Sequence, residues 1–492
     1  MEASRPLRVV VDVDADLVDQ PAGQHLTWLL VTLLVRSTRT AIETIAVRAV
    51  DAPLLAGVDP AEPDGGPSYL ASLKAAAQAF GPESALVVDA CSLDDVDLIL
   101  RVGETRQDDR PGAEVLYVSA AGWTGSVSPA ASDLPPFDAT NQNPFGPYVA
   151  ACLAAGQTFM YARVHDHRLQ MAVLNAWTLA QSTTDLAAVA AVDPGEPAVE
   201  LNHVLAGVGA VGSALLQIMW AYRPAAGTIR AADADSKGID NTNLNRCVPF
   251  WWSDIGNPKA TVAAERLSGH HGLVIDPTVG NAENLVDRDS HLISAVDTPE
   301  ARQALQDKYP ASAVQASTAG LRVEALRVDP TAGTACLRCF NPPRTKASDA
   351  EIRASVADMD SDTIATHADA IGTDPEQVRK WGRVGGCGQV GDALLHLLRP
   401  SDNSAAQFSV GFMSVLAGVL LAAQVIKDAV RRAGVPVGII DGVPLVGPNA
   451  RFVANLLEPA NALAGVRRYG RDKACPACRG VRAKIWTKRW TG

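Results

Sequence analysis

A glycine-rich turn in the second half of the chain constrains the fold more than any other stretch. In "HVLAGVGAVGSALLQIMW" (203–220), Gly207, Gly209 and Gly212 join an apolar strand pattern to an apolar helix pattern. Glycines at this spacing permit a tight turn and let a phosphate group approach the N–H groups at a helix N-terminus. The stretch therefore predicts an α/β, Rossmann-like domain with a mostly parallel sheet. A glycine turn needed only for chain packing is the alternative.

An acidic residue follows this turn where a nucleotide-binding fold would need it. The next strand pattern, "GTIRAADAD" (227–235), contains Asp233 about 20 residues beyond the last glycine, the position from which such an acid binds ribose hydroxyls. This combination suits an NAD site as well as an ATP site. An NAD-dependent oxidoreductase is therefore one reading at this point.

Basic side chains further along favour a triphosphate. "NLNR" (243–246) and "GNPKA" (256–260) supply Arg246 and Lys259, whose cationic groups can hold β- and γ-phosphates and stabilise departing pyrophosphate. Asp297 follows another apolar strand pattern and could bind magnesium. Alternatively, the two cations are solvated surface charges and Asp297 is a helix N-cap. Their shared order on one fold favours ATP.

These motifs resemble those of the ThiF family of adenylyltransferases, which includes the activating enzymes of ubiquitin-like proteins. The resemblance runs from "GVGAVG" (207–212) through "DADSKGIDNTNLNR" (233–246) to "CPAC" (475–478) and covers most of 201–480. It implies that the enzyme binds MgATP and joins AMP to the C-terminal glycine of a small β-grasp protein. The implied nucleotide-binding residues are Gly207, Gly209, Gly212, Asp233, Asp235, Asn243, Arg246, Lys259 and Asp297.

Two Cys-x-x-Cys pairs point to a metal. Cys336 and Cys339 form "CLRC", and Cys475 and Cys478 form "CPAC". Four thiolates are enough for a closed tetrahedral zinc site, although either pair alone could be a redox pair. The family resemblance favours zinc in a structural role.

A fifth cysteine, Cys387, lies among glycines in "RVGGCGQVGD" (383–392). Its spacing to Gly391 resembles that of the cysteine in the crossover loop of the family. The resemblance implies that the thiolate attacks the acyl-adenylate and forms a thioester. The alternative is a small apolar side chain in a tight turn.

The domain organisation follows from where these motifs lie. Residues 1–192 alternate strand and helix patterns without a phosphate loop, which indicates an α/β domain. We expect this domain to be adenylation-like but inactive, or else to recruit a partner. We expect the active ThiF-type domain over 201–480, with a helical lobe and crossover region inserted at 340–386. The family arginine that precedes the phosphate loop is missing here, and Arg5 and Arg8 are candidate replacements.

Composition narrows the class of protein. The 492-residue chain is 47% hydrophobic, 20% charged and has a net charge of −11, which argues against disorder and against a nucleic-acid partner. The start lacks a signal-peptide pattern. The apolar run at 408–426 is long enough to span a membrane, but its small and polar residues favour a buried helix. We expect a cytoplasmic protein without a membrane partner.

The sequence thus predicts an ATP-dependent activating enzyme for a ubiquitin-like protein. Arg246, Lys259, Asp297 and Cys387 are the predicted catalytic residues, and a conjugating enzyme would accept the acyl group from Cys387. The chain would act as an intrachain pseudo-dimer or as a homodimer. The alternatives are a sulfur-carrier or small-molecule adenylyltransferase without a thioester step, and a catalytically dead scaffold. The Arg- and Ala-rich composition suggests a bacterial source and, by analogy, a role in antiviral defence.

Overall fold

The chain forms two compact units in a computed structural model. In the described part of the chain, the first unit, Met1–Asn341 with Ser409–Gly492, holds two sheets, and the second, Pro342–Phe408, holds three helices. The residues that the structure describes are 6–38, 40–81, 86–87, 95–103, 112–164, 167–185, 189, 193–328, 335–341, 349–384, 390, 394, 410–434, 450–456, 465–468, 471–472, 475–481, 483–485 and 488.

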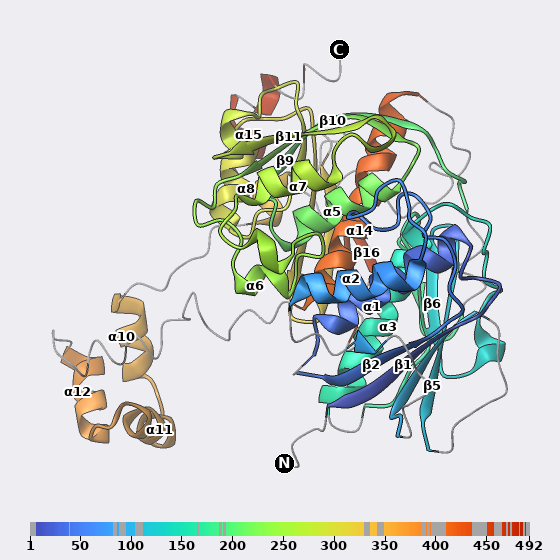
Figure 1. Cartoon of the computed structure of the whole chain (residues 1–492). Helices are drawn as coiled ribbons and strands as arrows, with labels where there is room; N and C mark the ends of the chain where they lie inside the picture. Colours follow the sequence, from blue (N-terminus) through green and yellow to red (C-terminus); the bar gives the residue numbers. More distant parts are fainter. Residues whose placement is uncertain are drawn as a thin grey trace. The chain divides into compact units, whose positions relative to one another are not determined.

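The N-terminal half contains an eight-stranded sheet (Figure 1). In the order β3-β2-β1-β4-β5-β6-β7-β8, the pairs from β3 to β5 are parallel and those from β5 to β8 are antiparallel. The strands are β1 (Leu7–Val13), β2 (Ile42–Arg48), β3 (Leu86–Val87), β4 (Leu98–Val102), β5 (Glu114–Ala121), β6 (Thr124–Ser128), β7 (Ala172–Asn175) and β8 (Gln181–Ser182). The helices are α1 (Pro21–Val35), α2 (Tyr69–Phe80) and α3 (Phe145–Arg163).

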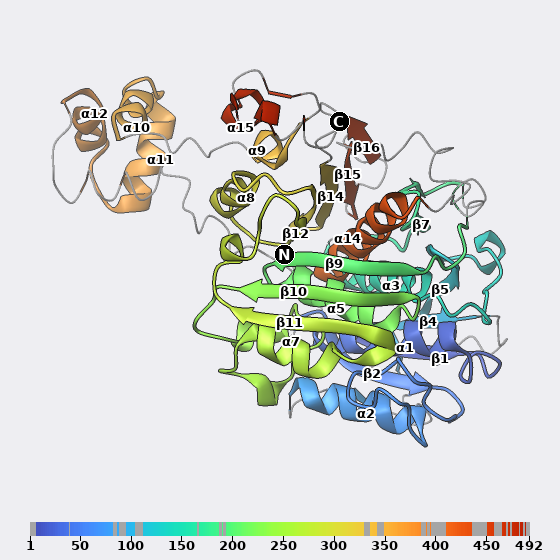
Figure 2. The ribbon, with the colours of Figure 1, turned by 90° about the horizontal axis from the view of Figure 1, so that it is seen from above.

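The second sheet repeats this arrangement strand for strand. Its order is β11-β10-β9-β12-β13-β14-β15-β16, parallel from β11 to β13 and antiparallel from β13 to β16, and Figure 2 shows β11, β10 and β9 side by side. The strands are β9 (Val199–Ala206), β10 (Ala225–Asp233), β11 (Leu273–Val279), β12 (His291–Ser294), β13 (Ser312–Ala319), β14 (Arg322–Val328), β15 (Ala450–Asn455) and β16 (Gly465–Arg468). The helices are α5 (Ala210–Ala221), α6 (Asn241–Leu244), α7 (Lys259–Leu267), α8 (Pro299–Gln306), α9 (Leu337–Phe340), α14 (Gly411–Arg432) and α15 (Pro476–Arg479). Two mostly parallel α/β sheets confirm the predicted fold class.

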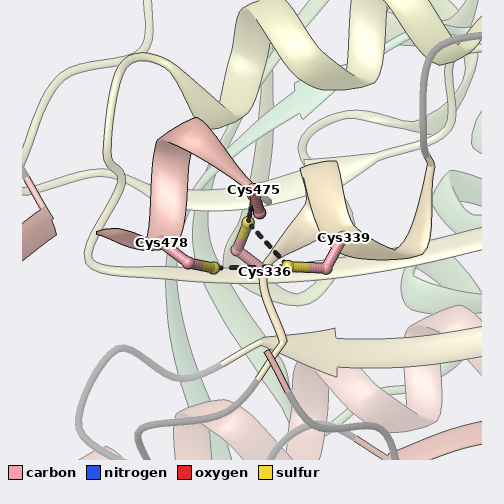
Figure 3. A group of neighbouring side chains, drawn as sticks. All are labelled: Cys336, Cys339, Cys475 and Cys478. Atoms are coloured by element: carbon pink, nitrogen blue, oxygen red, sulfur yellow. Dashed lines mark hydrogen bonds between the residues drawn. The ribbon is translucent and has the colours of Figure 1, made fainter. Parts of the chain in front are cut away.

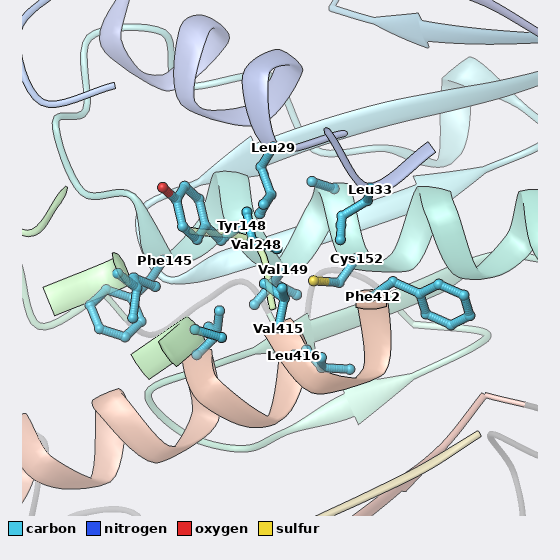
Figure 4. Close-up of a cluster of buried hydrophobic side chains, with 14 of the residues drawn as sticks. Leu29, Leu33, Phe145, Tyr148, Val149, Cys152, Val248, Phe412, Val415 and Leu416 are labelled. Carbon is cyan, nitrogen blue, oxygen red and sulfur yellow. The ribbon is translucent and has the colours of Figure 1, made fainter. Parts of the chain in front are cut away.

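Four helices join the two halves in one core. α3 packs against α1 and α14, and α14 packs against α5. Figure 4 shows Leu29 and Leu33 of α1 meeting Val149 of α3, with Val415 of α14 beside them. Each of these side chains is buried, so the first half is part of the same hydrophobic core as the second.

The apolar run predicted to form a buried helix is α14. It is the one described helix long and apolar enough to cross a membrane, and every residue of its apolar window is buried within the protein. Small residues allow this close packing: a Cβ at Gly418 would lie 2.6 Å from the Cβ of Ala214 in α5. The small residues that interrupt the run are thus explained by helix packing.

The second unit contains α10 (Asp349–Ala357), α11 (Ser361–Ile371) and α12 (Pro375–Val384). They enclose a separate small core that includes Val356, Ile364 and Val378. The unit overlaps the lobe predicted at 340–386. Cys387, just beyond α12, lies outside the described residues.

Candidate nucleotide site and cysteine cluster

The glycine turn connects β9 to α5, and its three glycines have different surroundings. Gly207 has φ +90°, and a Cβ there would lie 2.9 Å from the carbonyl oxygen of Ala295. A Cβ at Gly212 would overlap the carbonyl oxygen of Gly207. Gly209, the N-cap of α5, has open space at its Cβ position. Gly207 and Gly212 therefore serve the close packing of the turn, and Gly209 leaves room for a ligand at the helix N-terminus.

Asp233 is attached directly to this turn. Its Oδ2 accepts a hydrogen bond from the N–H of Val208 at 2.7 Å, and its Oδ1 accepts one from the N–H of Asp235 at 2.9 Å. The half-buried carboxylate keeps further lone pairs for hydroxyl donors. Asp233 thus lies beside the α5 N-terminus with the orientation of its carboxylate fixed by backbone donors.

Lys259 and Asp235 form an ion pair beside the same strand end. The Lys259 Nζ lies 2.5 Å from Asp235 Oδ2, and Lys259 is buried while Asp235 is exposed. The pKa of Asp235 lies below its ordinary value, chiefly because Lys259 donates this hydrogen bond. Asp235 therefore orients the ammonium group of Lys259, a role that the sequence did not reveal.

The predicted amide and arginine lie on and just after the short helix α6. Asn243 is buried, and its Oδ1 accepts a hydrogen bond from the N–H of Asp240, the N-cap residue, at 2.9 Å. The Arg246 Nε donates to the carbonyl oxygen of Thr242 at 3.2 Å. Within the described part of the chain Arg246 makes no ion pair, so its terminal N–H groups can meet a ligand. Asn243 shapes the helix start, and Arg246 supplies the charge.

The positive charges of Arg246 and Lys259 both act on the pKa of one buried thiol, that of Cys247. Burial raises the pKa of Cys247 to about 11, while a hydrogen bond with Ser213 and the positive charges of Arg246, Lys259 and Arg36 oppose this rise. Both predicted phosphate-binding cations therefore favour the charged form of this thiol.

Asp297 lies beyond β12, exposed and three residues past the strand end. The alternative reading of Asp297 as a helix N-cap is wrong, because Thr298 caps α8 by accepting a hydrogen bond from the N–H of Ala301 at 3.2 Å. β12 is parallel to β9, and β9 to β10. Asp297 therefore follows the same sheet edge as the glycine turn and Asp233.

The edge of the first sheet that corresponds to this site carries buried charges instead. Asp12 on β1 pairs in register with Arg48 on β2 and Arg101 on β4. Its Oδ2 lies 2.6 Å from an Arg48 nitrogen and 3.6 Å from Arg101 Nε. On the second sheet the last residues of β9, β10 and β12 are followed by the glycine turn and two acids. The two edges share their strand order and differ in their chemistry.

The four cysteines of the Cys-x-x-Cys pairs converge on one point (Figure 3). Their sulfurs all lie within 4.8 Å of one another; Cys336 is 3.8 Å from Cys339 and 3.7 Å from Cys475, and Cys339 is 3.3 Å from Cys478. A tetrahedral zinc ion with Zn–S bonds of about 2.3 Å places its sulfurs about 3.8 Å apart. The cluster therefore fits a zinc ion without rearrangement of the backbone.

The protonation of these thiols also favours a cation. Hydrogen bonds with Cys336 and Cys478 hold the pKa of Cys339 well below its usual value, whereas the hydrogen bond to Cys339 raises the pKa of Cys336. One thiolate is thus stabilised at the expense of its neighbours. Further thiolates at this separation require a positive ion to offset their repulsion.

Of the two arginines proposed to replace the family arginine, Arg8 is engaged elsewhere. It lies 3.2 Å from Asp95 and 3.5 Å from Glu43 within the first half, and Arg5 is outside the described residues. The arginine of the first half that contacts the segment after Arg246 is Arg36, which donates to the carbonyl oxygen of Val248 at 2.8 Å. Nothing in the local sequence singles it out.

Comparisons with known proteins identify two matching family profiles and several similar solved structures. The ThiF family profile matches residues 198–436, and that of the BilD N-terminal domain matches residues 8–179. Similar solved structures are those of E. coli MccB with succinimide (17% identity, TM-score 0.34), with MccA-N7isoASN (16%, 0.35) and without either (18%, 0.35). Each of these structures matches 57% of this chain. The match spans 66%, 67% and 64% of the three MccB chains, in the same order, so the first and the last are matched over slightly less than two thirds of their length.

No curated protein sequence matches the chain. The two family profiles together account for most of both halves. With its glycine turn, acid and cations in the matched region, the part of the chain over residues 198–436 is a ThiF family domain.

Proposed function

We propose that the ThiF domain uses MgATP to activate the C-terminal glycine of a ubiquitin-like, β-grasp protein. The observation that carries this proposal is the grouping of Gly209, Asp233 and Lys259 beside one sheet edge, with Arg246 just after the short helix α6 that follows this edge in the chain. A helix N-terminus binds phosphate, a carboxylate binds ribose, and two cations stabilise the charge of a leaving pyrophosphate. An NAD enzyme has no evident use for the two cations.

In the first step, a carboxylate oxygen of the partner would attack the α-phosphorus of ATP. The new acyl–oxygen–phosphorus bond forms as the bond between the α-phosphorus and the bridging oxygen breaks, and pyrophosphate leaves. Arg246, free of ion pairs among the described residues, and Lys259, oriented by Asp235, would stabilise the charge that develops on the leaving group. Magnesium, when bound, neutralises phosphate charge, and Asp297 would be its protein ligand.

In the second step, the thiolate of Cys387 would attack the acyl carbon and release AMP, which leaves a thioester. This step rests on the family resemblance of the segment around Cys387. A thiol of a conjugating enzyme would then accept the acyl group by exchange. A sulfur-carrier or small-molecule adenylyltransferase would stop after the first step, with Cys387 dispensable.

The first half would be the inactive counterpart of the adenylation domain within the same chain. Its strand order matches that of the second half, but Asp12, Arg48 and Arg101 fill its corresponding edge with mutual ion pairs. Such an edge offers no glycine turn to a phosphate. The Cys336–Cys478 cluster would hold a structural zinc ion, and a bacterial cytoplasm is the proposed setting.

ATP–pyrophosphate exchange with candidate ubiquitin-like proteins that end in glycine tests this proposal. Wild type, Cys387→Ala and the matched control Cys152→Ala, a buried α3 residue, are compared, followed by a non-reducing gel. Exchange in all three with a thiol-sensitive adduct lost only in Cys387→Ala is expected. Exchange without any adduct would remove the thioester step, and no exchange with a verified partner would refute the proposal.

A further inference from the structure

One arginine of the first half is hydrogen-bonded to the backbone that follows Arg246. The NH2 group of Arg36, at the end of α1, donates to the carbonyl oxygens of Val248 at 2.8 Å and Phe250 at 3.3 Å. Arg36 is 8% exposed and lies 212 residues from Val248 in the sequence. Val248 and Phe250 belong to the segment 247–254, which begins directly after Arg246.

This segment is held from both halves of the chain. Arg266 of α7 donates to the carbonyl oxygen of Pro249, which lies between the two acceptors of Arg36, and forms an ion pair with Asp254 at 2.7 Å. The carbonyl oxygens of Val248 and Phe250 therefore accept from Arg36, and the carbonyl oxygen of Pro249 between them accepts from Arg266. Removal of Arg36 leaves two of these three carbonyls without their arginine donor.

The residues just before the segment are enclosed as well. A Cβ at Gly411, the first residue of α14, would lie 2.9 Å from the carbonyl oxygen of Asn245 and 3.8 Å from the Cδ of Arg36. α1 and α14 thus meet at the backbone that follows Asn243. A shift of either helix end would move the backbone on which Arg246 stands.

The charge of Arg36 has no acidic partner among the described residues. Its guanidinium contacts carbonyl oxygens and lies 5.0 Å from the centroid of the Phe80 ring. A buried cation without a carboxylate is costly, and the positive charge of Arg36 acts on the pKa of the Cys247 thiol together with those of Arg246 and Lys259. An anionic triphosphate would offset this concentration of positive charge.

We propose that Arg36 is a positioning residue of the nucleotide site, through which the first half orders the backbone at 245–250 and thereby aims Arg246 at the triphosphate. This inference rests on the proposed function. It gives the first half a defined part in ATP binding without a nucleotide site of its own.

Arg36→Met removes the donors and keeps most of the apolar stem, and Arg36→Lys restores a charged donor. The control is Arg223→Ala, which deletes another hydrogen bond between the halves, to the carbonyl oxygen of Ala56 at 3.0 Å on the exposed surface. Three assays are made on the full chain: amide hydrogen exchange of 241–250 without ATP, equilibrium dialysis for ATP affinity, and pyrophosphate exchange for the KM and kcat of ATP.

We expect Arg36→Met to speed amide hydrogen exchange across 241–250. It should also weaken ATP affinity about tenfold or more, as expected for the loss of hydrogen bonds from a charged group. KM should rise more than kcat falls, Arg36→Lys should recover part of the affinity, and Arg223→Ala should match wild type. Unchanged amide hydrogen exchange and unchanged ATP affinity in Arg36→Met would overturn the inference. Lower thermal stability of this variant with wild-type ATP affinity would also overturn it.

The outcomes also separate the inference from the proposed function. ATP binding that depends on Arg36, without pyrophosphate exchange by any candidate partner, would overturn the proposed activity and support the role of Arg36. A wild-type chain that binds no ATP would overturn both.

Discussion

Loss of one cysteine from the cluster should empty a metal site on which the C-terminal segment depends. Cys478 is one of four thiols within 4.8 Å, and its sulfur lies 3.3 Å from that of Cys339. Cys478→Ser removes one of four ligands, and a zinc ion held by the remaining three would be exposed to solvent at its fourth position. We expect one zinc ion per chain in wild type and little or none in this variant.

The size of the effect follows from what the cluster joins. Structural zinc contributes roughly 10–16 kcal/mol of apparent binding free energy, whereas a whole domain is stable by about 5–15 kcal/mol. α15 is only four residues long, and one hydrogen bond between it and the body runs from the hydroxyl of Tyr309 to the carbonyl oxygen of Ala477 at 3.3 Å. Without the ion, the segment from 475 should detach and the midpoint of thermal unfolding should fall.

Elemental analysis gives the zinc content, and calorimetry with and without a chelator gives the unfolding midpoint. Cys247→Ala, a buried cysteine outside the cluster, is the matched control and should keep its zinc. A folded, reduced wild type without metal would refute this reasoning. Mapping of Cys336–Cys339 and Cys475–Cys478 as disulfides would favour the redox reading instead.

Three further predictions concern the two sheet edges. Gly212→Ala should lower the free energy of unfolding, measured with denaturant, by about 1–3 kcal/mol through overpacking. Gly209→Ala should fold normally and bind ATP more weakly in equilibrium dialysis. Equal stability of these two variants would contradict the roles assigned to the two glycines. Lys259 lowers the pKa of Asp235 in the folded protein, so the Asp235 carboxylate stabilises the protein at pH values above its unfolded pKa, and this stabilisation is lost as pH falls through its folded pKa. The stability of Asp235→Asn should therefore approach that of wild type below about pH 4. A constant difference in stability between the two proteins at all pH values would argue against the ion pair. Arg48→Ala should cost about 1.5–3 kcal/mol by removal of a charged hydrogen bond, with ATP stoichiometry unchanged; a lower ATP stoichiometry would place a nucleotide on the first sheet.

Local features were predictable from the sequence, and long-range contacts were not. The glycine turn and Asp233 lie on one strand–turn–helix–strand pattern, so their spacing predicted their proximity. The four cysteines carried a signal because Cys-x-x-Cys pairs are rare and specific. By contrast, Asp235 and Lys259 are 24 residues apart. Asp235 lies in a loop and Lys259 begins α7, so no helix or strand periodicity predicts that they form a pair.

The capping role of Thr298 and the contacts of Arg36 depend on backbone geometry that the local sequence does not encode. Asp297 and Thr298 are both good N-cap residues, and only the backbone geometry selects the second. Arg36 lies on an otherwise apolar helix end, where an arginine is unremarkable, and its acceptors are backbone carbonyls without a sequence signature. The sequence predicted an adenylation-like first half, but the match of its strand order to the second sheet, strand for strand, became visible only in the structure.

The joining of two matching sheets in one polypeptide has a consequence for dilution. In a dimer of separate chains, an arginine lent by one subunit is lost when the subunits dissociate, so specific activity falls at low protein concentration. Here Arg36 and the segment it binds are covalently linked, and their effective concentration does not depend on how much protein is present. The rate per chain should therefore stay constant down to very dilute enzyme, and the two halves are free to diverge because neither has to serve as its own partner.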